Sequence, residues 1–220
     1  MNCYVQDIAG KEKLDTLIIG ASNASKFYNT FLKTKKGIEF IYLSNIFNCN
    51  VEPVVSKISS TIRKPTRLVI FLNSNRILPC LKFLENEELH VHETKRKWVK
   101  CKEKDKIQRI LTNYKKLFLA FPFDHIVLLP HFYRSFLPTC KCKNAFRISY
   151  WKQRNTFQKV ETSIKQTLTD YDIRFVFIEH DWIFPEKMFW LNYPLKTDQI
   201  HFLDSGLRKI HEVFFFILNI

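Results

Sequence analysis

Residues 14–36 read LDTLIIGASNASKFYNTFLKTKK, and the hydrophobic pattern of this stretch changes at Gly20. Residues 14–20 form an almost continuous apolar run, which is typical of a strand that is buried on both faces. Apolar side chains then recur at helical spacing over residues 23–36, and Gly37 supplies a helix stop signal. The stretch therefore predicts a buried strand that is followed at once by an amphipathic helix.

The same alternation continues along the chain. Further apolar runs predict four more strands, at residues 38–43, 67–72, 126–129 and 173–178. Amphipathic stretches predict helices at residues 51–63, 147–169 and 205–218, the last with Asp204 as its N-cap. Strands that alternate with helices form a parallel sheet that is covered on both faces. The predicted fold class is therefore α/β, with a five-stranded parallel sheet in a three-layer α/β/α arrangement.

The length and composition of the chain indicate how many domains it forms and in which compartment it is expected. A chain of 220 residues suits one domain, so we expect residues 1–220 to form a single domain. Its apolar runs are far shorter than the roughly 20 residues of a membrane-spanning helix. Its first residues lack the apolar core of a secretory signal, so the six cysteines are expected to be reduced thiols. These features predict an intracellular protein, cytoplasmic or nuclear, without a transmembrane segment.

The chain is strongly basic. Its 35 Lys and Arg residues outnumber 21 Asp and Glu residues and give a net charge of +14, which favours binding to polyanions. Many of the basic residues lie between the third and fourth predicted strands, where we expect a basic insertion at about residues 82–116. Its candidate phosphate contacts are Lys95, Arg96, Lys97 and Lys100. The other interpretation of this segment is a solvated helix face.

Polar side chains follow three of the predicted strands. Ser22 comes just after the first strand, Asn75 follows the third, and Asp198 and His201 lie between the fifth strand and the last helix. The carboxyl ends of parallel strands meet at one edge of a sheet, where ligands bind. A nucleophilic serine needs a base, the base needs an acid partner, and an amide can stabilise an oxyanion. These residues therefore predict an acyl-transfer site, although a serine at a helix start is otherwise an ordinary N-cap.

The three turns resemble sequence blocks of the SGNH (GDSL-type) hydrolases. Gly20-Ala21-Ser22 resembles the Gly-Asp-Ser block of the family, and Asn73-Ser74-Asn75-Arg76 is similar to its Gly-x-Asn-Asp block. Asp198-Gln199-Ile200-His201 resembles the Asp-x-x-His block that precedes the closing helix of the family. The resemblance runs from about residue 14 to residue 220.

This resemblance implies a fold, an activity and a role for each residue. It implies a flavodoxin-like sheet and the hydrolysis of esters or related acyl groups, with a small acyl ester as substrate and no cofactor. It also implies that Ser22 is the nucleophile, His201 its base, Asp198 the residue that orients His201, and Asn75 an oxyanion donor.

The chain also departs from the family pattern. Ala21 stands where the family usually has Asp. Asn73 and Arg76 stand where the family has the Gly and the Asp that flank the asparagine matched by Asn75. Residues 44–47, after the second predicted strand, contain no Gly to supply the backbone oxyanion donor of the family. These differences keep a second hypothesis open, in which a catalytically weak or inactive SGNH-like domain binds the phosphates of RNA or DNA.

Other interpretations of these turns agree less well with the order of the residues. The nucleophile elbow of α/β-hydrolases is excluded because that fold separates the acid from the histidine in sequence. A dinucleotide site is excluded because the first turn lacks the G-x-G-x-x-G pattern. The closely spaced His125, His131, Cys140 and Cys142 lack the usual spacing of a zinc site. We therefore expect neither a metal ion nor a cofactor.

Overall fold

The structure is a computed structural model, and the part of the chain that it describes has several gaps. The described residues are 14–43, 51–59, 65–72, 103–119, 123, 125–132, 150–185 and 201–218. The six cysteines all lie outside these ranges.

A five-stranded parallel sheet forms the centre of the molecule. Its strands are β1 (Thr16–Gly20), β2 (Ile38–Tyr42), β3 (Arg67–Phe71), β4 (His125–Leu129) and β5 (Phe175–Phe177). Their order is β2-β1-β3-β4-β5, and every neighbouring pair is parallel. This is the flavodoxin-like strand order. The predicted α/β class and the predicted parallel sheet are confirmed.

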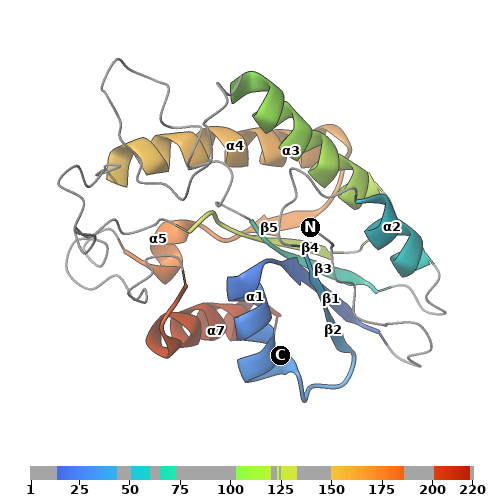
Figure 1. The fold of residues 1–220 in the computed structure, drawn as a ribbon, viewed down its shortest axis with the longest axis vertical. Coiled ribbons are helices and arrows are strands. Elements are labelled where there is room, and N and C mark those ends of the chain that lie inside the picture. Colours follow the sequence, from blue (N-terminus) through green and yellow to red (C-terminus); the bar gives the residue numbers. More distant parts are fainter. Residues whose placement is uncertain are drawn as a thin grey trace, which may run out of the picture.

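Helices cover both faces of the sheet (Figure 1). One face carries α2 (Glu52–Ser59), α3 (Glu103–Leu119) and α4 (Tyr150–Asp170). The other face carries α1 (Ser22–Phe27), the π-helical turn η1 (Tyr28–Leu32), α5 (His180–Ile183) and α7 (Asp204–Leu218). The layers are therefore α/β/α, as the alternation of strands and helices predicts. Among the described residues, no helix is both long enough and apolar enough to cross a membrane.

Two hydrophobic clusters, one on each face, hold the layers together. Successive residues of β1 point to opposite faces, so Leu17 and Ile19 enter the cluster under α3 and α4, whereas Ile18 enters the cluster under α1 and α7. A fully buried side chain of this kind contributes about 1.5–3 kcal/mol. An exposed ion pair such as Lys116–Glu52 contributes about 0–1 kcal/mol. Apolar burial on both faces therefore determines the stability of the fold.

The ends of several elements differ from the predicted ones. The helix expected over residues 23–36 begins at Ser22 and widens into the π-helical turn η1. The last helix begins at Asp204, so this residue is inside the helix instead of being its N-cap. The chain enters β2 through Gly37, whose φ of +79° lies in the left-handed region that favours glycine. These differences leave the order of the elements unchanged.

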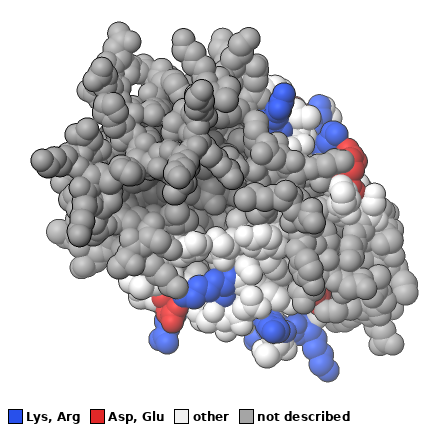
Figure 2. Space-filling model, viewed as in Figure 1, with Lys and Arg blue, Asp and Glu red and all other residues white. Residues whose placement is uncertain are grey.

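Part of the basic segment belongs to the core layers. Residues 103–116, the end of the predicted insertion at about 82–116, lie in α3 and turn Ile110 and Tyr114 into the core. α3 is thus an amphipathic crossover helix between β3 and β4. On the face shown in Figure 2, Lys and Arg are more prominent than Asp and Glu among the described residues, in keeping with the net charge of +14.

Candidate active site

The turn after β1 places Ser22 at the carboxyl edge of the sheet. β2 and β3 flank β1 on opposite sides, so the chain reverses its direction across the sheet at this strand. In open parallel sheets, ligands bind at this kind of switch point. Gly20 allows the turn to be tight, because a Cβ at this position would lie 2.4 Å from Ala24 Cβ and 2.9 Å from Phe71 Cβ. α1 can therefore start directly above β3 only with glycine at residue 20.

The hydroxyl of Ser22 points to a histidine and does not cap its helix. The N-cap residue of α1 is Ala21, and no side chain makes a capping hydrogen bond there. Ser22 Oγ lies 2.9 Å from His201 Nε2, in a partly buried position, although the two residues are 179 positions apart. When the neutral imidazole carries its proton on Nδ1, the hydroxyl donates to Nε2. The contact has the geometry of a nucleophile and its general base.

A second set of contacts holds the segment that carries His201. Phe202 is fully buried, and its ring packs against Phe132 at 4.9 Å and Phe184 at 5.2 Å between ring centroids. The Phe202 N–H donates to Asn23 Oδ1 at 3.1 Å, and Lys26 Nζ donates to the Phe202 carbonyl at 3.4 Å. Lys26 also pairs with Asp204 at the start of α7. α1 is therefore joined at several points to residues 201–204, which lead into α7.

The other predicted site residues are not placed. Asn75 and Asp198 lie outside the described residues, so their roles as oxyanion donor and orienting acid stay predictions. The candidate phosphate contacts Lys95, Arg96, Lys97 and Lys100 also lie outside them. Of the four predicted catalytic residues, the structure thus places Ser22 and His201, and it brings these two together.

Two further histidines follow β4 and β5 at the same edge of the sheet, and both are buried. His131 Nδ1 lies 2.9 Å from Glu161 Oε1, and the His131 N–H donates to the same oxygen at 2.8 Å. His180 lies beside Asp181, with 3.6 Å between Nδ1 and Oδ1. Burial lowers the pKa of His180 below its usual range, and Asp181 partly opposes this shift. The burial of both residues comes from tertiary packing, which their positions in the sequence do not indicate.

The geometry gives no support to a zinc site on His125 and His131. β4 begins at His125, and His131 follows its other end, so about 20 Å of extended chain separates them. Cys140 and Cys142 lie outside the described residues. Within the described part of the chain, no group of three or more His, Cys, Asp or Glu residues could hold a metal ion.

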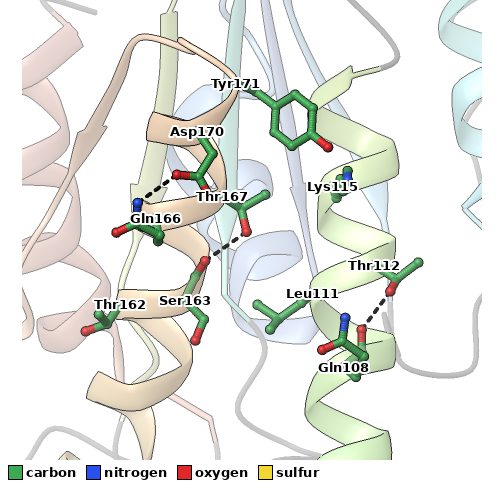
Figure 3. Close-up of a pocket in the computed structure, with 10 residues that line it drawn as sticks. All are labelled: Gln108, Leu111, Thr112, Lys115, Thr162, Ser163, Gln166, Thr167, Asp170 and Tyr171. Carbon is green, nitrogen blue, oxygen red and sulfur yellow. Dashed lines mark hydrogen bonds between the residues drawn. The ribbon is translucent and has the colours of Figure 1, made fainter.

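A polar groove of about 780 Å³ lies between α3 and α4, on the face of the sheet opposite to α1 (Figure 3). Thr112 Oγ1 donates to the Gln108 carbonyl at 2.8 Å, and Thr167 Oγ1 donates to the Ser163 carbonyl at 2.9 Å. Ser163 Oγ itself donates to the Lys159 carbonyl at 3.0 Å. These hydroxyls bond to the backbone of their own helices, which is their usual behaviour in helices. The Ser22–His201 contact is therefore the better candidate for catalysis.

Solved structures share this architecture at low sequence identity. No family model and no curated protein matches the chain in sequence. A protein from Streptococcus pneumonia named for platelet activating factor has a TM-score of 0.57 and 13% identity, over 94% of this chain and 84% of its own. An acetyl-xylooligosaccharide esterase from Geobacillus, Axe2, has a TM-score of 0.51 and 16% identity, over 96% and 95%.

A third structure, of a gut microbial diltiazem-metabolizing enzyme, has a TM-score of 0.50 and 15% identity, over 95% of this chain and 48% of its own. At these identities the likeness concerns the fold. The parallel sheet, its covering helices and these neighbours agree with one another. The chain therefore has the three-layer fold of the SGNH-type esterases, as its sequence blocks predict.

Proposed function

We propose that this chain is a serine esterase that hydrolyses a small acyl ester through Ser22 and His201. The observation that carries the proposal is the 2.9 Å contact between Ser22 Oγ and His201 Nε2 at the carboxyl edge of β1. A serine hydroxyl is a weak nucleophile unless a base removes its proton. His201 is placed to remove it, and the esterase fold supports the same chemistry.

The proposed reaction has two halves. Ser22 Oγ attacks the acyl carbon while His201 Nε2 takes the hydroxyl proton, and the carbonyl oxygen becomes an oxyanion. When this intermediate collapses, the bond to the leaving alcohol breaks, and the alcohol leaves with the proton from His201. Ser22 then carries the acyl group as an ester. Water attacks that ester, His201 takes and returns a proton, and the carboxylic acid leaves.

Two supporting roles follow from the resemblance to the SGNH hydrolases. Asp198 would accept a hydrogen bond from His201 Nδ1, and would thereby keep Nε2 free to act as the base. The Asn75 amide would donate to the oxyanion, together with the backbone N–H of Ser22 at the start of α1. Both residues belong to the same proposal, and Ser22 and His201 are its centre.

The test is the reaction of Ser22 with a fluorophosphonate probe and the hydrolysis of p-nitrophenyl acetate. Ser22→Ala should abolish labelling and lower kcat by at least about 10³-fold, because the nucleophile is gone. Ser25→Ala is a matched control on the same short helix, since Ser25 Oγ accepts a hydrogen bond from Asn29 on the exposed side. This control should keep both activities. If Ser22→Ala is labelled as fast as the unchanged protein, Ser22 is not the nucleophile.

A further inference from the structure

Asn23 and Phe202 form a second contact between the two segments that Ser22 and His201 join. Asn23 follows Ser22 in α1, and Phe202 follows His201, so the two contacts are adjacent. The Phe202 N–H donates to Asn23 Oδ1 at 3.1 Å. We propose that Asn23 is a positioning residue, which holds His201 at hydrogen-bonding distance from Ser22 by fixing the peptide that joins His201 to Phe202. This inference rests on the proposed esterase function.

The apolar contacts of Phe202 do not fix this peptide by themselves. Its ring packs against Phe132 and Phe184 in a cluster that excludes water, but apolar attraction has little directional preference. A hydrogen bond weakens steeply when its angle changes, so it fixes orientation. The N–H that Asn23 accepts belongs to the peptide unit whose other end is His201. A rotation of that peptide would move the imidazole away from Ser22 Oγ.

Lys26 acts on the other side of the same residue. Its Nζ donates to the Phe202 carbonyl at 3.4 Å and pairs with Asp204. α1 therefore holds both the N–H and the carbonyl of Phe202, one with Asn23 and the other with Lys26. The hydrogen bond from Lys26 Nζ to the Phe202 carbonyl is longer than the hydrogen bond to Asn23 and is partly exposed. It also lies on the side of Phe202 that is away from His201. For this reason we assign the positioning of His201 to Asn23.

The choice of asparagine also fits this role. Asn is a weaker helix former than Ala, so helix propensity alone would not place it in the first turn of α1. Its amide oxygen accepts the Phe202 N–H without adding a charge beside His201. An aspartate would accept the same hydrogen bond, but it would add a negative charge beside His201. Substitution of residue 23 can therefore separate the effect of its hydrogen bond to the Phe202 N–H from the effect of its charge.

The experiment compares Asn23→Ala, Asn23→Asp and the control Asn29→Ala, which removes an exposed asparagine from the neighbouring turn η1. With p-nitrophenyl acetate, Asn23→Ala should lower kcat by about 10- to 100-fold with little change in KM, because a small misplacement of a base is costly. Its midpoint in urea should fall, because the Phe202 N–H loses its acceptor, so kcat is compared under conditions in which each variant is folded. Asn29→Ala should keep the kcat of the unchanged protein.

The pH profile separates positioning from a general structural effect. Asn23→Asp should regain most of the lost kcat at pH 8, because its carboxylate restores the acceptor for the Phe202 N–H. The acidic limb of its profile should move to higher pH, because a negative charge beside a general base favours the protonated, inactive form of that base. Equal kcat values for Asn23→Ala and Asn29→Ala would overturn the inference, and so would an Asn23→Asp protein that is as slow as Asn23→Ala at every pH.

Amide hydrogen exchange at Phe202 tests the same contact without any activity. Its protection should fall at least tenfold in Asn23→Ala and stay unchanged in Asn29→Ala. If the unchanged protein neither reacts with the fluorophosphonate nor hydrolyses the ester, the proposed function fails. Unchanged protection of the Phe202 amide in Asn23→Ala would overturn the positioning role itself, whatever the activity.

Discussion

Gly20 lies where β1, α1 and β3 come closest to one another. A Cβ at residue 20 would meet Ala24 Cβ at 2.4 Å and Phe71 Cβ at 2.9 Å, and both atoms belong to buried residues. Neither neighbour is the end of a flexible side chain, so α1 or β3 would have to shift. Since Ser22 begins α1, the same shift would move its hydroxyl relative to His201.

We expect Gly20→Ala to lower both the stability and the activity of the protein. Overpacking of this kind costs about 1–3 kcal/mol of unfolding free energy, which urea denaturation measures. The kcat for ester hydrolysis, measured on folded protein, should fall at the same time. Gly37→Ala is the control, because its φ of +79° also makes Ala unfavourable, but it lies at the amino end of β2, away from Ser22. A Gly20→Ala protein with the kcat of Gly37→Ala would contradict this account.

At the scale of elements, the hydrophobic periodicity of the sequence predicts the strands and most of the longer helices. The five strands are apolar runs, and all but the edge strand β5, in which Val176 is exposed, are buried over most of both faces. Each strand lies within the range that its run predicts or starts one residue before it. α5 was missed because a helix of four residues is too short to show a helical period. The π-helical turn η1 was also missed, because it shares the apolar spacing of an α-helix. The order of the strands was thus predictable, whereas the helix α3 within the expected basic insertion and the local helix geometry were not.

The candidate site was predictable for the same kind of reason, and only in part. Ser22 and His201 are recognisable because their blocks follow strands at the sheet edge where parallel strands end. The Asn23–Phe202 contact could not be predicted, because its donor is a backbone N–H that every residue except proline possesses. The buried contact of Glu161 with His131 could not be predicted either, because an acidic residue in an amphipathic helix is usually exposed to solvent.

Glu161 connects α4 to the segment after β4. Its Oε1 accepts the His131 N–H at 2.8 Å and faces His131 Nδ1 at 2.9 Å, with both side chains almost fully buried. The His131 ring also stacks on Phe157, one turn before Glu161 in α4. An ionised carboxylate only accepts hydrogen bonds, so Nδ1 carries the ring proton. Two buried donors therefore depend on one oxygen atom.

We expect Glu161→Leu to lower the unfolding free energy by about 1–3 kcal/mol for each donor left without an acceptor. Glu161→Gln keeps an acceptor oxygen and should cost less. Glu179→Leu is a matched control, because Glu179 forms a largely exposed ion pair with Lys165, and its loss should cost about 1 kcal/mol or less. Urea denaturation of the three variants measures these differences. Equal losses for Glu161→Leu and Glu179→Leu would show that the buried contact is not stabilising.

At the scale of the whole molecule, two histidines in the layer of α1 and α7 make stability depend on pH. Burial lowers the pKa of His180, which Asp181, Glu161 and Arg154 also influence. Burial also lowers the pKa of His211, and the Lys35 charge adds to this effect, whereas Glu212 opposes it. In both cases the folded state resists protonation more strongly than the unfolded chain does.

The direction of the pH effect follows from proton linkage. A histidine with a lowered pKa in the folded state binds protons mainly after unfolding, once the pH falls below about 6.5. The unfolding free energy should therefore decrease as the pH falls from 7 to 5. Protonation also increases a net charge that is already +14, and the resulting repulsion acts in the same direction. Because repulsion is nearly equal in a protein and its single variant, the difference between their pH profiles isolates one histidine.

His180→Gln should therefore flatten the pH dependence of stability. Glutamine has no titrating group, and the side chain at residue 180 packs beside Phe132 and Phe184, where protonation is most unfavourable. We expect the variant to lose less unfolding free energy between pH 7 and pH 5 than the unchanged protein, as measured by urea denaturation at several pH values. His211→Gln should change the profile in the same direction and by less, because His211 is only partly buried. If His180→Gln loses as much unfolding free energy as the unchanged protein over this range, protonation of His180 does not oppose folding, and the acid sensitivity must come from the overall positive charge.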